Sequence, residues 1–366
     1  MKVECSKDKL REAVSQIGKI ASKNLSLPIL ESILLEAKDK NIILRATNLD
    51  VGLEIKVPAR VEKSGSTALP ADILNAFLSG FSDGQTIKME LINNNLSLST
   101  PRNSTVIKSF SVDDFPTIPQ IDKDGVVSIE ANKLVLGIKS VIYAASLSDM
   151  KPEISSVYIY TENDDLFFVS TDSFRLAEKR ITGQIKDQKM SIVLPFRNAI
   201  EVARIFDQSK DILDVYFNKN QISIISPFIY FTSRVVGGIF PDYKQIIPKE
   251  KKTEVVVLKK DLIDSIKVSN IFSDKFNQIN IKVIPEDSLF EISSRNQDRG
   301  ESSTRVPGTV EGETVDVNLN ARYILDSLQS ISEDSIHLIF NGSNKPLIIR
   351  GIGDKTFLYL VMPMNN

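Results

Sequence analysis

The stretch Phe240-Pro241-Asp242-Tyr243-Lys244-Gln245-Ile246-Ile247-Pro248 decides the fold, because its beginning occurs twice in the chain. A second Phe-Pro pair opens Phe115-Pro116-Thr117-Ile118-Pro119, which lies 125 residues upstream. Leu-Pro pairs that begin at Leu69 and Leu194 are also 125 residues apart, and Leu319 adds a third position at this spacing. A long-range repeat of this kind predicts one domain written three times.

Each predicted domain contains two copies of a smaller unit, in which a strand and a helix precede three strands. Residues 1–6 alternate in hydropathy as a strand does, and Leu10, Val14 and Ile17 follow at helical spacing. Predicted strands over 29–36, 42–46 and 52–57 complete this unit, and further helices are predicted over 71–81, 133–145, 196–207, 261–271 and 321–328. We expect an α+β fold with domains at 1–121, 126–246 and 253–366.

The composition is that of an ordinary globular protein, with 366 residues, 42% hydrophobic and 25% charged. The single cysteine, Cys5, excludes an internal disulfide framework and fits a reducing cytoplasm. Because Cys5 alternates with Val3, we interpret it as a buried apolar side chain. The first residues lack the apolar region of a secretory signal, and no run of 18 apolar residues predicts a membrane span. We expect a cytoplasmic protein.

The predicted helices hold a charge asymmetry that the total of −2 conceals. Segments 7–20, 70–81, 132–146, 195–206, 258–271 and 320–331 together carry +5, so the rest of the chain carries −7. Most of the positive charge comes from Lys9, Arg11, Lys139, Arg197, Arg204, Lys260, Lys267 and Arg322. If these helices share one surface, that surface attracts phosphates, and without interleaved aromatic residues it grips the nucleic-acid backbone independently of sequence.

The sequence proposes no catalytic site, no metal and no cofactor. It contains neither a phosphate-binding GxxxxGK[ST] loop nor a GxGxxG motif. The only histidine, His337, lies in an alternating strand without a nucleophile motif nearby, so we interpret it as structural. The adjacent carboxylates Asp113-Asp114 and Asp164-Asp165 are typical of turns.

Four motifs, taken in order with the triple repeat, resemble the bacterial DNA polymerase III beta-subunit family, the sliding clamps. They are Leu27-Pro28-Ile29-Leu30, the run from Thr171 to Ala177 (TDSFRLA), Phe240-Pro241-Asp242-Tyr243, and the run from Tyr359 to Met364 (YLVMPM). The resemblance covers the whole chain. It implies a head-to-tail homodimer that closes as a six-domain ring around double-stranded DNA, with helices inside and sheets outside. The implied function is processivity without chemistry of its own.

The resemblance also implies a pocket for short linear peptides. Its expected partners are the DNA polymerase III alpha subunit, the clamp-loader delta subunit, other polymerases and repair proteins, and no membrane. By position, the pocket residues are Ile154, Thr171, Ser173, Phe174, Arg175, Leu176, Pro241, Ile246, Pro346, Leu360, Val361, Met362, Pro363 and Met364. Ser173 and Phe174 stand where relatives often carry glycine and histidine or tyrosine, so the preferred peptide is expected to differ.

DNA and dimer contacts follow from the resemblance in the same way. The expected DNA-contact residues are Lys23, Asn24, Lys139, Arg197, Arg204 and Lys260. For the dimer, the resemblance implies that Ile107 on an edge strand meets Ile271 and Phe272 of a second copy. Two other hypotheses remain open at this point: a monomeric peptide-binding adaptor that never encircles DNA, and an enzyme on a repeated α+β scaffold.

Overall fold

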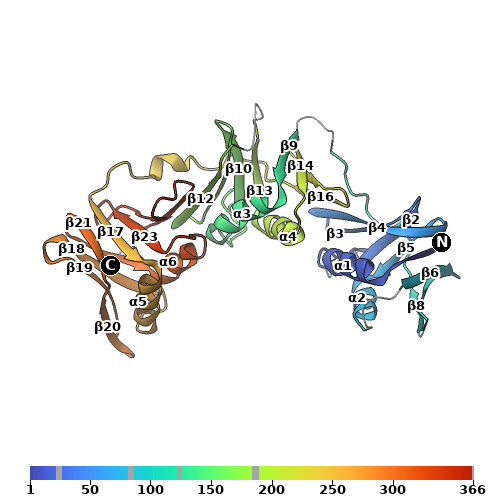
Figure 1. The fold of residues 1–366 in the computed structure, drawn as a ribbon, viewed down its shortest axis with the longest axis horizontal. Coiled ribbons are helices and arrows are strands. Elements are labelled where there is room, and N and C mark those ends of the chain that lie inside the picture. The colour runs from blue at the N-terminus through green and yellow to red at the C-terminus, as the bar shows by residue number, and fades with distance from the viewer. Residues whose placement is uncertain (22–26, 81–85, 102, 122–125, 184–188, 365–366) are drawn as a thin grey trace. The chain divides into compact units, whose positions relative to one another are not determined.

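The computed structural model describes residues 1–21, 27–80, 86–101, 103–121, 126–183 and 189–364 (Figure 1). The chain divides into two compact units. Unit 1 comprises Met1–Ala131 and Ile205–Val235, and unit 2 comprises Asn132–Arg204 and Val236–Asn366. Each unit is a mixture of helices and antiparallel strands, so the α+β prediction is confirmed.

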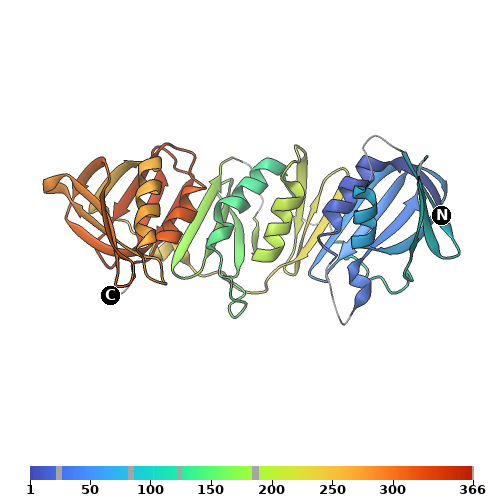
Figure 2. The same ribbon diagram turned by 90° about the horizontal axis from the view of Figure 1, so that it is seen from below.

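Unit 1 is built on antiparallel strands that two helices cover on one face (Figure 2). The strands are β1 (Lys2–Ser6), β2 (Ser32–Lys38), β3 (Asn41–Thr47), β4 (Val51–Lys63), β5 (Gly65–Pro70), β6 (Thr86–Ile92), β7 (Asn95–Ser99), β8 (Ser104–Lys108), β9 (Val126–Glu130), β14 (Ile212–Phe217), β15 (Gln221–Ile225) and β16 (Ile229–Arg234). Their order is β8-β7-β6-β1-β4-β16-β15-β14-β9, with β3, β2 and β5 following from β4. The helices are α1 (Lys7–Ile17) and α2 (Ala71–Ser79).

Apolar periodicity explains α1, whose Leu10, Val14 and Ile17 are all buried against the sheet. The strand predicted over 29–36 begins only at Ser32, because Pro28–Glu31 forms a 3₁₀ turn (η1) with proline in its first position. The predicted burial of Cys5 is confirmed, and burial raises the pKa of its thiol to about 12.

Unit 2 contains a nine-stranded and a four-stranded antiparallel sheet. Its strands are β10 (Ser156–Glu162), β11 (Asp165–Thr171), β12 (Arg175–Ile181), β13 (Ser191–Pro195), β17 (Thr253–Leu258), β18 (Gln278–Ile284), β19 (Leu289–Asn296), β20 (Gly300–Arg305), β21 (Gly308–Gly312), β22 (Val315–Asn320), β23 (Ser335–Phe340), β24 (Leu347–Gly351) and β25 (Phe357–Val361). The orders are β13-β10-β11-β12-β25-β24-β23-β17-β21 and β20-β19-β18-β22.

Helices α5 (Lys259–Ile271) and α6 (Ala321–Leu328) of unit 2 pack against each other. Helix α3 (Ala131–Val141) continues as the 3₁₀ turn η2 (Ile142–Ala144), and α4 (Phe196–Phe206) begins directly after β13. Two more 3₁₀ turns, η3 (Tyr243–Ile246) and η4 (Pro285–Asp287), lie outside the helices. Among the described residues, no helix combines the length and the apolar character that crossing a membrane requires.

Identical hydrogen bonds recur at the predicted repeat spacing, which confirms the triple repeat in the backbone itself. The side chains of Asn48, Asp172 and Asn296, each 124 residues from the next, accept from the backbone N–H groups two and three residues later. A second recurring bond follows the last strand of each domain. Its donors and acceptors are Phe110 to Ala68, Val236 to Val193 and Met364 to Asn318, each at 2.8 Å.

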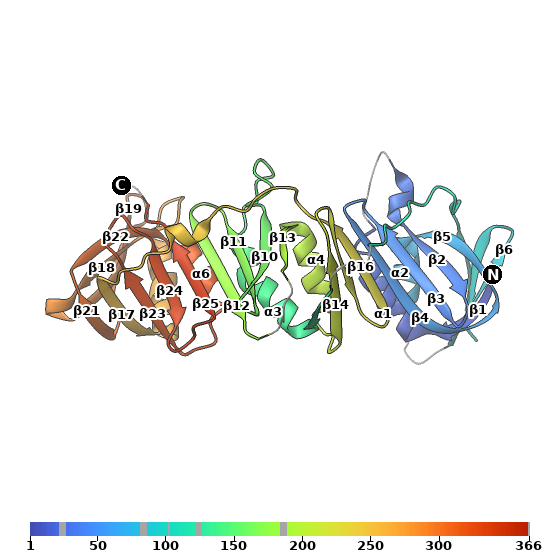
Figure 3. The same cartoon turned by 90° about the horizontal axis from the view of Figure 1, so that it is seen from above.

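The last strand of a domain also pairs with the fourth strand of the domain before it. Strand β16 pairs with β4, with Ser233 opposite Val51, and β25 pairs with β12, with Val361 opposite Arg175 (Figure 3). The equivalent strands that remain are β8, the last strand of the first domain, and β20, the fourth strand of the third. Both stand at the end of a described sheet with one edge unpaired.

Candidate functional site

The turn from Thr171 to Arg175 organises the predicted pocket. Thr171 Oγ1 donates to the carbonyl of Arg175 at 2.7 Å and accepts from the N–H of Ser173 at 3.1 Å. Asp172 Oδ1 accepts from the N–H groups of Phe174 and Arg175 at 2.9 and 3.0 Å. These bonds hold Ser173 in the left-handed region at a φ of 78°, where a side chain is sterically disfavoured.

The backbone of Phe174 is held by hydrogen bonds, whereas its side chain is exposed to solvent. Its N–H is held by Asp172, and its carbonyl accepts from the N–H of Met362 at 2.8 Å. Its side chain is 63% exposed, and Met362 and Ile246 are exposed as well. Folding gains little from an aromatic ring left in water, so Phe174 and the adjacent Met362 offer accessible apolar side chains beside the turn.

Arg175 connects the turn to helix α6. Its Nε contacts Asp172 Oδ2 at 2.9 Å, its Nη1 contacts Asp326 Oδ2 at 2.7 Å, and its guanidinium lies 4.3 Å from the centre of the Tyr323 ring. Burial by itself lowers the pKa of Arg175, but Tyr359, Asp326 and Asp172 outweigh it and raise the pKa above its usual value. The guanidinium is therefore a permanent charge that fixes the start of β12.

The remaining predicted pocket residues divide by burial. Ile154, Thr171, Leu176, Pro346, Leu360 and Val361 are buried, Pro363 and Met364 are half-buried, and Ser173 and Pro241 are exposed. Strand pairing brings several of them together, because Val361 lies opposite Arg175 on one side and Leu347, next to Pro346, on the other. Ile154 precedes β10, two strands from β12.

A polar cavity of about 580 Å³ lies on the other side of the C-terminal segment. Met362, Pro363 and Met364 form one wall, and Asn318 and Asn344 contribute amides to the rest. The segment is held in place by the Met364 N–H, which donates to Asn318. Met362–Met364 therefore presents side chains to solvent while its backbone is fixed.

The contacts of Tyr323 and Asp326 with Arg175 were not predicted from the sequence. Both lie on α6, and Asp326 is 151 residues from the arginine it pairs with. No local motif indicates such a pair. The signal that existed was helical spacing, since both residues fall on the turns of α6 that follow its cap, Asn320, whose side chain accepts from the Tyr323 N–H.

The predicted DNA-contact residues differ in how exposed they are. Lys139 on α3 and Lys260 on α5 are exposed. Arg197, in the first turn of α4, has a 74% exposed side chain and lies 3.6 Å from Asp149. Arg204 is bound by Glu201 of its own helix and is largely covered. Lys23 and Asn24 lie outside the described residues.

The predicted dimer residues are not equally accessible. Ile107 on β8 is only 4% exposed because its side chain packs into unit 1, whereas its neighbour Val106 is 62% exposed. On α5, Ile271 is exposed, and Phe272 beyond its end is half-buried. Side chains alternate between the faces of a strand, so the accessible apolar residue of β8 is Val106.

His337 and the paired aspartates, which we interpreted from the sequence as structural, lie in strands and turns. His337 on β23 contacts Glu254 Oε2 at 2.6 Å, and burial lowers its pKa, with Glu254 opposing. Asp113, Asp114 and Asp164 lie in turns, and Asp165 is the first residue of β11. Within the described ranges, no group of three His, Cys, Asp or Glu side chains is arranged to hold a metal ion.

Three family profiles match consecutive parts of the chain. They are the N-terminal, central and C-terminal domains of the DNA polymerase III beta subunit, at residues 1–119, 128–242 and 244–365. The chain belongs to the DNA polymerase III beta subunit family. The beta sliding clamps of Bacillus subtilis (strain 168) and Synechococcus elongatus are 26% and 25% identical to it, over 100% of this chain and 99% of each of theirs.

Solved structures of the family have the same fold. The DNA polymerase sliding clamp of Bacillus subtilis matches with a TM-score of 0.95 at 25% identity, covering 100% of this chain and 99% of that one. The beta subunit of Pseudomonas aeruginosa matches with a TM-score of 0.95 at 22% identity over 100% of both chains. The three-domain organisation of the family is thus the one seen in the repeated hydrogen bonds.

Replacing Ser173 by glycine is predicted to stabilise unit 2 relative to replacing it by alanine, by about 0.5–1 kcal/mol. Glycine adopts a positive φ without the penalty that any Cβ carries there. Alanine is the matched control because it keeps the Cβ and removes only the hydroxyl. Chemical denaturation of both variants measures the difference, and equal midpoints would show that the turn is unstrained.

Proposed function

We propose that two copies of this chain pair head to tail and close a ring around double-stranded DNA, tethering the replicative polymerase in the cytoplasm without catalysis of their own. The observation that carries this proposal is that β8 and β20 each have one unpaired edge among the described strands. Wherever the repeat continues within the chain, a last strand pairs with a fourth strand, as β16 does with β4 and β25 with β12. Joining β8 of one copy to β20 of another continues this pattern.

A contact of this kind is heterologous, because two different edges of the chain meet. Two such contacts close a ring of two copies, with domains at 1–121, 126–246 and 253–366 in each. Backbone hydrogen bonds along the edges and the accessible apolar side chains Val106 and Ile271 support the contact. Membership of the family supports the ring form.

The helices supply the proposed DNA-facing surface. Lys139, Arg197 and Lys260 project from three different helices and are exposed. A flexible charged side chain grips phosphate without reading bases, which is what a protein that moves along DNA needs. Arg204 is a weaker candidate, because Glu201 already occupies its guanidinium.

The turn from Thr171 to Arg175, the C-terminal Val361–Met364 and the segment 240–246 form the proposed binding site for partner peptides. Two solved structures of similar fold, the sliding clamps of Pseudomonas aeruginosa and Bartonella birtlesii, are described as bound to griselimycin, which provides a small-molecule probe for this chain. The expected partners are the polymerase alpha subunit, the clamp-loader delta subunit, and other polymerases and repair proteins. Exposed Phe174 and Met362 provide an adaptable apolar surface for them.

Introducing negative charge at the proposed strand contact is predicted to give monomers. The double variant Val106→Glu and Ile271→Glu places carboxylates on two exposed positions, so each chain still folds. Light scattering at micromolar concentration should give about twice 40.8 kDa for the unmodified chain and 40.8 kDa for the variant. Ile212→Glu, at an exposed apolar position outside the contact, is the control. A monomeric unmodified chain would instead favour the peptide-binding adaptor.

Reversing the charge of Lys139 and Arg197 to glutamate is predicted to shorten retention on nicked circular DNA several-fold at low salt. Two lost phosphate contacts become two repulsions, and the difference should fade as salt rises. Lys40→Glu with Lys219→Glu makes the same charge change at exposed hairpin positions and should have little effect. Equal retention of the two double variants would contradict the proposed role of the helices.

Deletion of Met362–Asn366 is predicted to abolish binding of the polymerase alpha subunit and leave the dimer intact. The deletion removes the segment whose N–H groups donate to the carbonyls of Phe174 and Asn318, and neither of these residues belongs to β8 or β20. Deleting only Asn365 and Asn366 is the matched control. Calorimetry with the alpha subunit measures the loss, and unchanged affinity after the longer deletion would contradict the site.

A further inference from the structure

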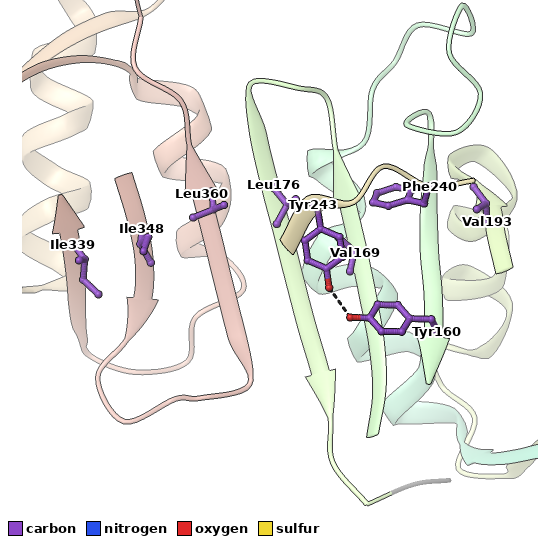
Figure 4. Close-up of a cluster of buried hydrophobic side chains, with 9 residues drawn as sticks. All are labelled: Tyr160, Val169, Leu176, Val193, Phe240, Tyr243, Ile339, Ile348 and Leu360. Carbon is purple, nitrogen blue, oxygen red and sulfur yellow. Dashed lines mark hydrogen bonds between the residues drawn. The ribbon is translucent and has the colours of Figure 1, made fainter. Parts of the chain in front are cut away.

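The hydroxyl of Tyr243 makes a buried chain of hydrogen bonds that the proposed function does not use. It donates to Glu178 Oε2 at 2.5 Å, and since a tyrosine has one proton, the 2.6 Å contact with Tyr160 is donated by the Tyr160 hydroxyl (Figure 4). Tyr243 lies on η3, while Tyr160 and Glu178 lie on β10 and β12. The chain therefore joins the segment 240–246 to two strands of the sheet.

We propose that Tyr243 is a positioning residue for ligand binding: its hydroxyl latches segment 240–246 to the sheet and so holds Pro241 and Ile246 at the rim of the peptide site. This inference rests on the proposed function, which assigns peptide ligands to that site. Ile246 is exposed three residues beyond the latch, and the Tyr243 N–H donates to the Pro241 carbonyl at 2.8 Å. The position of both residues is thus tied to Tyr243.

Aromatic packing and one surface ion pair complete the latch. Phe240 stacks on Tyr158 with ring centres 4.9 Å apart and meets Tyr243 edge-on at 6.3 Å. Lys244 Nζ reaches Glu162 at 2.6 Å. The same buried cluster contains Leu176 and Leu360, the neighbours of Arg175 and Val361 in the site (Figure 4). The latch and the site therefore share one stretch of sheet.

The three residues just before the latch pack loosely. A Cβ at Gly237 or Gly238 would meet almost no neighbouring atom, and Ile239 is 93% exposed, although Val236 before them donates to the Val193 carbonyl at 2.8 Å. Without the hydroxyl of Tyr243, the packing of Phe240 and Tyr243 and the exposed Lys244–Glu162 ion pair would remain to keep the segment on the sheet. We expect such a segment to open locally at a lower free-energy cost.

The first domain provides an internal comparison. Its equivalent of Glu178 is Glu54, 124 residues earlier, and Glu54 is bound by Arg45 of its own sheet at 2.8 Å. The equivalent of Tyr243 is Ile118, which has no hydroxyl and packs closely against Gly52. In the first domain, the glutamate is therefore bound by an arginine of the same sheet. In the second domain, where the proposed site lies, it is bound by Tyr243 of the segment 240–246.

The decisive variant is Tyr243→Phe, which removes the two hydrogen bonds and keeps the ring. Calorimetric titration with griselimycin should show affinity about tenfold weaker. Hydrogen exchange of the unliganded dimer should show faster exchange at residues 243–246 with the rest unchanged. The control is Glu54→Gln, which disturbs the equivalent buried glutamate of the first domain and should leave both readouts as they are.

Glu178 gives a second variant with a pH readout. Burial is the largest cause that raises the pKa of its carboxyl above 4.5, Tyr243, Lys244 and Arg180 oppose it, and Glu162 adds to it. A carboxyl with a raised folded pKa stabilises the fold most below pH 4.5, and this contribution is lost as pH rises through the folded pKa. Glu178→Gln keeps an acceptor for Tyr243 and removes the carboxylate, so its stability relative to the unmodified chain should be higher at pH 8 than at pH 4.5.

The outcomes separate the latch from the site. Normal affinity and normal exchange in Tyr243→Phe would overturn the latch. Faster exchange with normal affinity would overturn its positioning role. If the unmodified chain binds neither griselimycin nor the polymerase alpha subunit, the proposed site fails, and exchange at 243–246 still decides whether the hydroxyl fixes the segment.

Discussion

Antiparallel pairing between the last strand of one domain and the fourth strand of the preceding domain is the interaction on which the rest of this structure depends. It aligns Val361 with Arg175 and Ser233 with Val51, and so determines which residues lie next to the turns that precede Arg175 and Val51. Backbone N–H and C=O groups along a strand edge are strong, directional binding groups. Within the chain, the last strand of a domain pairs with the fourth strand of the domain before it. Among the described strands this leaves two edges unpaired, that of β8 in the first domain and that of β20 in the third.

The same turn is part of the proposed peptide site in the second domain and recurs in the first domain, where no site is proposed. Thr47 to Val51 repeats the bonds of Thr171 to Arg175, including a left-handed residue, Leu49, at a φ of 76°. The carbonyl of Asp50 accepts from Arg234 as that of Phe174 accepts from Met362. The backbone is thus conserved between the copies, while charged side chains in the first replace the exposed apolar ones of the second. Function follows from the side chains placed on a shared scaffold.

Much of the fold could be predicted from the sequence, because helical spacing and the 125-residue repeat are local or periodic signals. The site was reached through the motifs of the family. The hydrogen-bond partners of the site residues could not be predicted, because Arg175 contacts Asp326 at a sequence separation of 151 residues and Tyr243 contacts Glu178 at a separation of 65 residues. Burial shows a further limit. Which face of a strand is buried depends on its register, so the sequence did not reveal that Ile107 is buried and Val106 exposed in the single chain.

The central claim is that the protein holds DNA by topology and not by affinity. The most direct measurement is retention of the loaded dimer on nicked circular DNA before and after the circle is cut once. A closed ring should stay with the circle and be lost from the linear molecule within the time needed to slide off its ends, at the same salt concentration. Equal retention on circular and linear DNA would contradict the account, because it would show that the contacts alone hold the DNA.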